Sequence, residues 1–317
     1  MRDSKLLVSI LINNYNYGRF LREAIDSALN QTYPNTEVIV VDDQSTDDSR
    51  EIIASYGDRI IPVLKENGGH GSTFNAGFAV SKGSLICYLD SDDVWLPTKV
   101  ERIVEAALAH PDAVLIYHRV QPVSADLRPI HKVFPTVLLQ GDISAKVKGA
   151  GGWWACAPTS AQCLTRCVLE RIGPLPEKEL QTAPDAFFQY LLPFLGPVVG
   201  VREPLVLYRR HGANDSSTVA FGEKAPELQA FIANLERYER LVNAANACLE
   251  ELRVGVKLRM ADHLAYQSLR YRTGLSGHWS RIPLAWRALK FPGIPSATIR
   301  LKLAVRSILQ GRLRASE

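Results

Sequence analysis

The sequence predicts an α/β protein with a mostly parallel sheet flanked by helices. Over the first 120 residues, short β-branched runs alternate with segments of helical periodicity, which is typical of strands joined by covering helices. Hydrophobic residues form 46% of the 317 residues and charged residues 22%, so the disordered and collagen-like classes are excluded. A chain of this length can bury a core of its own.

Five strands and four helices are expected in this first part. The helices repeat apolar residues on one face, as Phe20, Leu21, Ala24 and Ile25 do. The strands are predicted at 7–12, 37–41, 60–64, 85–89 and 113–117, and the helices at 20–29, 49–56, 73–81 and 99–109.

The pattern weakens after residue 120. An irregular connection with a strand or two is expected to residue 160, then helices at 164–171 and 185–192 and a strand at 205–208. A long helical region begins near Pro226 and runs to about Arg270, and shorter helices punctuated by prolines follow. These boundaries divide the chain into residues 1–120, 121–222 and a basic helical extension, 223–317.

No apolar run is long enough to span a bilayer, and no secretory signal is recognisable, so the cytoplasm is the expected compartment. The five cysteines form no C-x-x-C pair, which favours free thiols over a zinc ribbon or a disulfide framework.

Positive charge is concentrated in the last part of the chain. Residues 252–317 hold 13 Lys and Arg against two acids, while the whole chain has a net charge of +4. Residues 296–317 combine apolar and basic positions, which predicts peripheral contact with an anionic membrane at the inner face of the plasma membrane; a helix packed on the body is the alternative. No nucleic-acid-binding motif accompanies the charge, so no nucleic-acid partner is expected.

Acidic residues directly follow two of the predicted strands. Asp42 and Asp43 follow 38–41, and Asp90, Asp92 and Asp93 follow 85–89. Because ligands bind beyond the carboxyl ends of parallel strands, both clusters are expected to face one crevice. Carboxylates without nearby Cys favour Mg²⁺ or Mn²⁺ held together with substrate phosphates.

Five segments in order resemble the family 2 glycosyltransferases of the GT-A fold. They are VSILINNYNY (8–17), QTYP (31–34), VVDDQSTDD (40–48), NGGHGSTFNAG (67–77) and YLDSDD (88–93). The resemblance covers about the first 100 residues and implies the GT-A fold and a nucleoside-diphosphate sugar donor.

The resemblance also implies roles for the residues at the strand ends. Asp43, with Asp42 as its neighbour, would accept a hydrogen bond from the base, and Tyr15 would stack on it, with simple packing as the alternative for this tyrosine. Asp92 matches the metal ligand, and His70 is expected to be incidental. The remaining predicted donor contacts are Asn14, Asn67, Gly68, Asp90 and Ser91.

The catalytic base of the family is a Glu-Asp pair at a helix start, which Pro184-Asp185 matches only in its second residue. Asp185 is therefore the predicted base, with a helix-capping role as the alternative and Glu179 as the substitute. His211 would complete the metal shell or touch the diphosphate, unless it is structural. Arg209 and Arg210 would support the diphosphate, and Trp153 and Trp154 would form a sugar platform or belong to the core.

The predicted function is metal-dependent, inverting transfer of a sugar from a nucleoside-diphosphate donor to a saccharide or lipid-linked acceptor in cell-surface polysaccharide synthesis. Uridine is the favoured base by resemblance, while GDP and dTDP stay open. Two alternatives remain: a non-catalytic sugar-nucleotide binding or scaffold protein, and a nucleotidyltransferase, although the glycine-rich phosphate loop of the latter is missing after the first strand.

Overall fold

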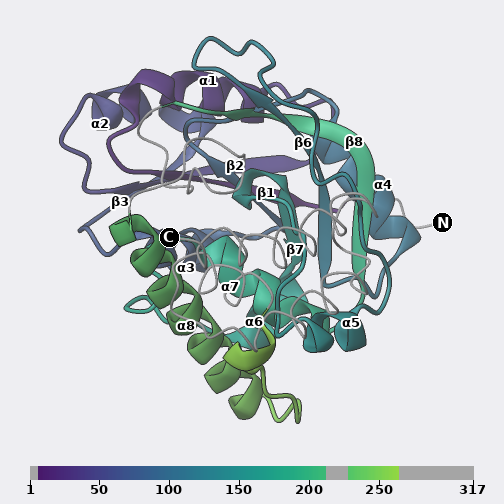
Figure 1. The fold of residues 1–317 in the computed structure, drawn as a ribbon. Coiled ribbons are helices and arrows are strands. Elements are labelled where there is room, and N and C mark those ends of the chain that lie inside the picture. Colours follow the sequence, from purple (N-terminus) through teal and green to yellow (C-terminus); the bar gives the residue numbers. More distant parts are fainter. Residues whose placement is uncertain (1–5, 212–227, 264–317) are drawn as a thin grey trace.

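A mixed sheet of eight strands forms the centre of the computed structural model, which describes residues 6–211 and 228–263 (Figure 1). Its strand order is β3-β2-β1-β4-β7-β6-β8-β5. The strands are β1 (Val8–Asn14), β2 (Thr36–Asp43), β3 (Ile61–Lys65), β4 (Leu85–Asp90), β5 (Val94–Trp95), β6 (Leu115–Val123), β7 (Gln162–Thr165) and β8 (Val198–Arg209).

The first four strands in this order are parallel and bring their carboxyl ends to one edge. All seven residues of β1 are buried, as expected of a strand covered on both faces. In the strand register Asn14 lies opposite Asp42 and Asn13 opposite Asp90. The two acidic clusters therefore meet at the end of β1.

Helices cover both faces of this parallel half. α1 (Gly18–Leu29) and α2 (Ser49–Ala54) lie on one face, and α3 (His70–Val80) lies on the other (Figure 1). α4 (Lys99–Ala109) meets the end of α1, where the side-chain oxygen of Gln31 accepts from the Val100 N–H. The apolar stripe predicted for α1 is buried.

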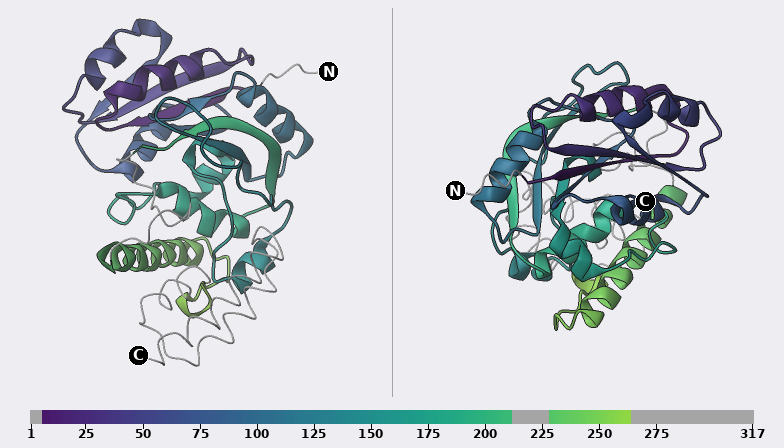
Figure 2. Two further views of the ribbon diagram at one scale, coloured as in Figure 1. Left: turned by 45° about the horizontal axis from the view of Figure 1, so that its top comes forward. Right: turned by 180° about the vertical axis from the view of Figure 1, so that it is seen from behind.

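The second half of the sheet is mixed. β7 is antiparallel to both β4 and β6, whereas β8 runs parallel to β6 with two register shifts. The helices here are α5 (Ser144–Gly149), α6 (Arg166–Ile172), α7 (Pro184–Leu191) and α8 (Leu228–Glu251), and α8 packs against α7 (Figures 1 and 2). Single 3₁₀ turns lie at Gly57–Arg59, Thr159–Ala161, Leu192–Phe194 and Met260–Asp262.

The structure confirms the α/β class and the strands predicted at stated positions. The strand or two expected between residues 120 and 160 are reduced to the end of β6 and isolated bridges, and α5 lies there instead. Three predictions after residue 160 also need correction. The helix expected from residue 164 begins at Arg166, because Gln162–Thr165 pair as β7. The strand expected at 205–208 is part of a twelve-residue strand. The long helix ends at Glu251 rather than near Arg270, and the chain turns at Arg253 and Gly255, both with positive φ.

The later predictions fall partly outside the described residues, since residues 264–317 are among those not described. Within the described part, no helix combines the length and apolar character needed to cross a membrane. The five cysteines are free thiols, as predicted.

Candidate active site

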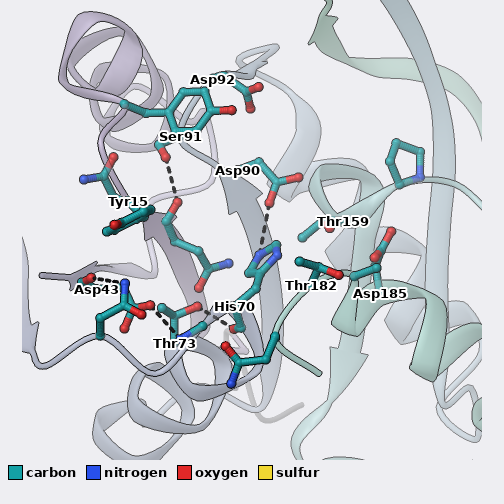
Figure 3. A pocket seen from close by; sticks show the side chains of 18 of the residues that line it. Tyr15, Asp43, His70, Thr73, Asp90, Ser91, Asp92, Thr159, Thr182 and Asp185 are labelled. Carbon is teal, nitrogen blue, oxygen red and sulfur yellow. Dashed lines mark hydrogen bonds and ion pairs between the residues drawn. The ribbon is translucent and has the colours of Figure 1, made fainter. Parts of the chain in front are cut away.

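A cavity of about 470 Å³ opens where β1, β2 and β4 end (Figure 3). Its strand-end side consists of Asn13, Asn14, Tyr15, Asp43, Asp90, Ser91 and Asp92, and its helical side consists of Gln181, Thr182, Ala183, Asp185 and Arg237. In Figure 3 Tyr15 and Asp43 lie across the cavity from Thr182 and Asp185, with Asp90 between them. Asn67, Gly69, His70, Thr73, Tyr17, Pro158, Thr159 and Tyr208 complete the lining.

Asp43 is fixed on the strand-end side by several donors. Its Oδ1 accepts from Lys65 Nζ at 2.7 Å and from the Gly68 N–H at 3.0 Å, and its Oδ2 accepts from the Gly69 N–H at 2.8 Å. Asn67 Nδ2 donates to the Asp43 carbonyl at 3.1 Å. The loop before α3 is thereby held against the end of β2, and Gly69 takes the positive φ of 83° that this approach requires.

Asp42 was predicted beside the nucleotide, but its side chain points away from the cavity. It is fully buried, and its carboxylate accepts from Arg50 at 2.8 Å, from the Ser45 N–H at 3.0 Å and from Asn14 Nδ2 at 3.0 Å. Burial alone would raise the pKa of Asp42, but these hydrogen bonds hold that pKa below its ordinary value. Asp42 therefore positions Asn14. Gly68 is also outside the lining, where its N–H supports Asp43.

Asn13, which the sequence analysis did not single out, is 6% exposed and lines the cavity. Among the described residues neither its side-chain nitrogen nor its oxygen has a hydrogen-bond partner. A buried amide without partners is costly, so this group is suited to a ligand that enters the cavity. Its neighbour Tyr15 is 49% exposed, as a ring that stacks on a ligand requires.

Asp90 faces the cavity between its two sides. Burial, followed by repulsion from Asp93, Asp92 and Asp185, raises its pKa well above the ordinary carboxylate value. His70 Nε2 lies 3.6 Å from Asp90 Oδ1, so the structure places this histidine in the cavity lining, although the sequence singled it out for no role. The effect of Asp185 on Asp90 also shows that the helical side approaches the acidic cluster.

Asp92 and His211 come together as the sequence predicts. Asp92 Oδ2 lies 3.0 Å from His211 Nε2, and the histidine ring packs against Tyr17 and Phe20. In the described part of the chain no group of three or more His, Cys, Asp or Glu is placed to enclose a metal ion. Two protein ligands nevertheless fit Mg²⁺ or Mn²⁺, which commonly takes its remaining ligands from substrate phosphates and water.

Arg209 does not face a diphosphate, in contrast to the prediction. Only 2% of it is exposed, and its guanidinium donates to Glu23 at 2.6 Å and to the carbonyls of Asp92 and Ala125 at 2.7 Å. It therefore fixes the backbone that carries Asp92. Arg210 is partly buried and is not among the residues that line the cavity.

Asp185 lies in the first turn of α7 and lines the cavity, as predicted for a base. Ala183 directly before the helix has a left-handed backbone, with φ of 56°, which turns the chain into α7. The substitute base Glu179 lines a different cavity together with Arg240. The geometry thus favours Asp185 over Glu179.

The tryptophan pair was predicted as a sugar platform or as core, and the structure supports the core. Trp154 is fully buried, its Nε1 donates to the Gln189 carbonyl at 2.8 Å, and its ring meets Tyr117 edge-on. Trp153 is partly buried against the same core. Neither lines the cavity.

Arg237 on α8 is the residue that sequence reasoning missed most completely. It is the only Arg or Lys among the described residues that line the cavity. No motif surrounds it in the sequence, and its place depends on how α8 packs on α7. The missed residues Thr159 and Thr182 likewise come from segments without a recognisable pattern.

Comparison with solved structures supports the fold. The chain superposes on Staphylococcus aureus TarS, solved with UDP-GlcNAc, with a TM-score of 0.57, 14% identity and coverage of 96% of this chain and 92% of that one. It superposes on the mannosyltransferase PcManGT of Pyrobaculum calidifontis, solved with GDP-Man and Mn²⁺, with a TM-score of 0.50, 17% identity and coverage of 97% and 88%. The architecture is therefore that of GT-A glycosyltransferases.

Sequence comparison defines the family. Residues 9–147 match the model of "Glycosyl transferase family 2". An uncharacterized glycosyltransferase of Nostoc sp. is 33% identical over 292 residues, which cover 88% of each chain. The UDP-Glc:alpha-D-GlcNAc-diphosphoundecaprenol beta-1,3-glucosyltransferase WfaP of Escherichia coli is 43% identical over 96 residues, which are 30% of this chain and 38% of WfaP. The chain belongs to glycosyltransferase family 2 and is a glycosyltransferase.

Proposed function

We propose that this glycosyltransferase transfers a sugar from a nucleoside-diphosphate sugar, with UDP as the favoured carrier, to a hydroxyl of a saccharide or lipid-linked acceptor with inversion of configuration. The proposal rests above all on the convergence of Asp43, Asp90, Asp92 and Asp185 from three separate elements on one cavity. Among the three functions that the sequence left open, family membership supports the glycosyltransferase.

The donor is assigned to the strand-end side. Asn13 and Asn14 line it, and the unpaired amide of Asn13 supplies both a donor and an acceptor for the nucleotide. Tyr15 provides an exposed ring for the base, and Asp43 lies beside it with its carboxylate already oriented by Lys65 and two backbone N–H groups. The UDP-GlcNAc complex of TarS, which shares the fold, supports the choice of a uridine carrier.

Asp92 and His211 are the residues that would hold Mn²⁺ or Mg²⁺. The acidic crowding that raises the pKa of Asp90 is relieved by a cation, which supports this assignment, as does the Mn²⁺ complex of PcManGT. When bound, the metal would neutralise charge on the diphosphate of the leaving nucleotide. Arg209 contributes indirectly, because it anchors the Asp92 carbonyl.

Asp185 acts in the proposed mechanism as the general base. Its carboxylate takes the proton of the acceptor hydroxyl as that oxygen forms a bond to C1 of the sugar, and the bond between C1 and the phosphate oxygen breaks. The nucleoside diphosphate leaves with the electron pair. Attack from the helical side, opposite Asp92, inverts the configuration at C1.

The acceptor and the cellular setting are further parts of the proposal. The name of WfaP describes a GlcNAc-diphosphoundecaprenol acceptor, which supports a lipid-linked acceptor and a role in cell-surface polysaccharide synthesis. A cytoplasmic location at the inner membrane face, with contact through residues 296–317, stays a prediction because those residues lie outside the described part. Flotation with anionic liposomes tests it, and a protein that stays unbound contradicts it.

A thermal-shift panel of UDP, GDP, dTDP and CMP, each with and without Mn²⁺, tests the donor assignment. One nucleotide is expected to stabilise the protein, and its effect is expected to depend on Mn²⁺. Incubation with the matching α-linked nucleotide sugar should then release the β-anomer of the sugar first, as followed by NMR. Stabilisation by none of the nucleotides would contradict the donor site, and release of the α-anomer would contradict inversion.

A further inference from the structure

The charges around the cavity are unevenly distributed. Four aspartates line it, and Arg237 is the one Arg or Lys side chain that does so in the described residues. The Arg237 side chain makes no hydrogen bond and no ion pair with another described residue. Its charge lowers the pKa values of Tyr190 and Tyr238, although the larger effect of burial raises both. A partly buried guanidinium is thus left available on a cavity wall.

The position of Arg237 associates it with the acceptor rather than the donor. Its helix α8 packs on α7, which carries Asp185 in its first turn. The metal and diphosphate are assigned to Asp92 and His211, and in Figure 3 Asp92 lies apart from Asp185 and Thr182. An inverting reaction places the leaving diphosphate and the attacking hydroxyl on opposite faces of the sugar. An anion that meets Arg237 therefore belongs to the molecule that approaches Asp185.

We propose that Arg237 is an acceptor-recognition residue and that the acceptor carries a phosphate close to the hydroxyl that is glycosylated. A guanidinium presents paired N–H donors that match two oxygens of a phosphate, and such charge-assisted pairs are stronger than neutral hydrogen bonds. Gln181 and Thr182, which line the same cavity, add polar groups that a sugar can contact. This inference rests on the proposed function, because it takes the acceptor side from the assignment of Asp185.

A sugar linked to a lipid through a diphosphate has this chemistry. Its phosphate lies one glycosidic bond away from the sugar whose hydroxyl accepts the transferred residue. Neutral glycans offer Arg237 only hydroxyl oxygens, whose hydrogen bonds with a guanidinium are weaker than those of a phosphate, so the proposal separates the lipid-diphosphate class from uncharged saccharide acceptors.

The test measures binding of two small probes that differ in charge. Protein saturated with UDP and Mn²⁺ is titrated with α-D-GlcNAc 1-phosphate and with methyl α-D-GlcNAc, and the titrations are repeated without nucleotide. Bound UDP blocks the donor diphosphate site, so a phosphate that still binds uses another site. The wild type is expected to bind the phosphate probe about tenfold or more tightly than the neutral one, with UDP present.

The variant Arg237→Gln should abolish this preference while its affinity for UDP stays within about twofold of wild type. Arg240→Gln is the matched control, since Arg240 is one turn further along α8 and lines the other cavity, where its Nε donates to the Glu179 carbonyl. This control should keep the preference. Circular dichroism and melting temperature establish that both variants are folded.

Three results would overturn the inference: no phosphate preference in the wild type, a preference that disappears when UDP is bound, or a preference retained in Arg237→Gln. If the wild type does not bind UDP at all, the result would instead count against the proposed donor site. Equal losses of UDP affinity and phosphate preference in Arg237→Gln would assign the guanidinium to the donor diphosphate and contradict its acceptor role.

Discussion

The side chains on the strand-end side of the cavity are hydrogen-bonded to one another, whereas the charged side chains of the helical side have no such partners among the described residues. Asp43 accepts three hydrogen bonds and Asn14 donates to both Asp42 and Ser45. The side chains of Asp185 and Arg237 form no hydrogen bond with any other residue that the structure describes. Under the proposed function, the difference corresponds to a preorganised nucleotide site that faces groups able to exchange protons and bind a second substrate.

Two buried cations hold the loop that carries Asp92 against its neighbours. Arg209 connects β8 to Glu23 and to the Asp92 backbone. Lys99, fully buried on α4, donates to the Ser160 carbonyl at 3.0 Å and lies 3.1 Å from the centre of the Trp95 ring. These contacts fix the acidic loop after β4 relative to the segment before β7.

Removal of the carboxylate at Asp92 is expected to have the largest effect, because both the metal and the diphosphate depend on it. Asp92→Ala should lower turnover by about 10³-fold or more and remove the Mn²⁺-dependent part of UDP binding. Turnover assays and thermal shifts with and without Mn²⁺ measure the two effects. Asp58→Asn, on the exposed 3₁₀ turn, is the control. A Mn²⁺ response that survives in Asp92→Ala would show that the metal is held elsewhere.

Asp185→Asn tests the helical side alone. Loss of a general base should lower kcat by about 10²- to 10⁴-fold. UDP affinity should change by less than about twofold, because the strand-end side is intact. Glu179→Gln is the matched comparison, since it removes one acid from the neighbouring cavity and should leave kcat unchanged. If Glu179→Gln is the damaging variant, the two cavities have been assigned the wrong way round.

The role of the buried Lys99 can be tested through the pH dependence of folding stability. Burial lowers its pKa to about 7 in the folded protein, while in the unfolded chain it stays near 10.4. Between these values the unfolded chain binds more protons, so Lys99 makes stability rise with pH, by up to about 1.4 kcal/mol per unit. Below pH 7 Lys99 is protonated in both the folded and the unfolded chain, so it no longer makes stability depend on pH.

Chemical denaturation of the wild type and of Lys99→Met at pH 7, 8 and 9 measures this contribution. Stability of the variant should no longer rise with pH. The Ser160 carbonyl keeps a donor without the Lys99 amine, because Trp95 Nε1 donates to it at 3.0 Å. Parallel pH dependences in the two proteins would mean that Lys99 stays charged when buried.

The strand-end side of the cavity could be predicted well, because each of its residues is placed by the strand that directly precedes it in the sequence. A buried parallel strand followed at once by Asp or Asn places that side chain at the sheet edge, so Asn14, Asp43 and Asp92 could be assigned to the cavity. What the pattern does not contain is the direction of each side chain. Asp42 and Asp43 are adjacent and therefore alternate about the strand, and only Asp43 lines the cavity.

The helical side could be predicted only in part. Asp185 was found through its resemblance to a family motif, whereas Arg237 depends on the packing of α8 against α7 across some fifty residues of sequence. Arg209 was misjudged for the opposite reason, since residue type suggested a ligand contact while burial and hydrogen bonding assign it to the interior. For Trp154 residue type left a sugar platform and a core position both open, and burial and hydrogen bonding support the core. Burial of long or aromatic side chains is a tertiary property that spacing does not encode.

Tyr15 gives the smallest expected effect and separates binding from chemistry. Tyr15→Ala removes an exposed ring that nothing else in the site requires, so the KM for the donor should rise about threefold to tenfold while kcat stays unchanged. Tyr15→Phe keeps the ring and should behave as wild type in steady-state kinetics. If Tyr15→Ala instead raised the KM for the acceptor, the base would not lie on the strand-end side, and the preorganised region would have to be reassigned to the second substrate.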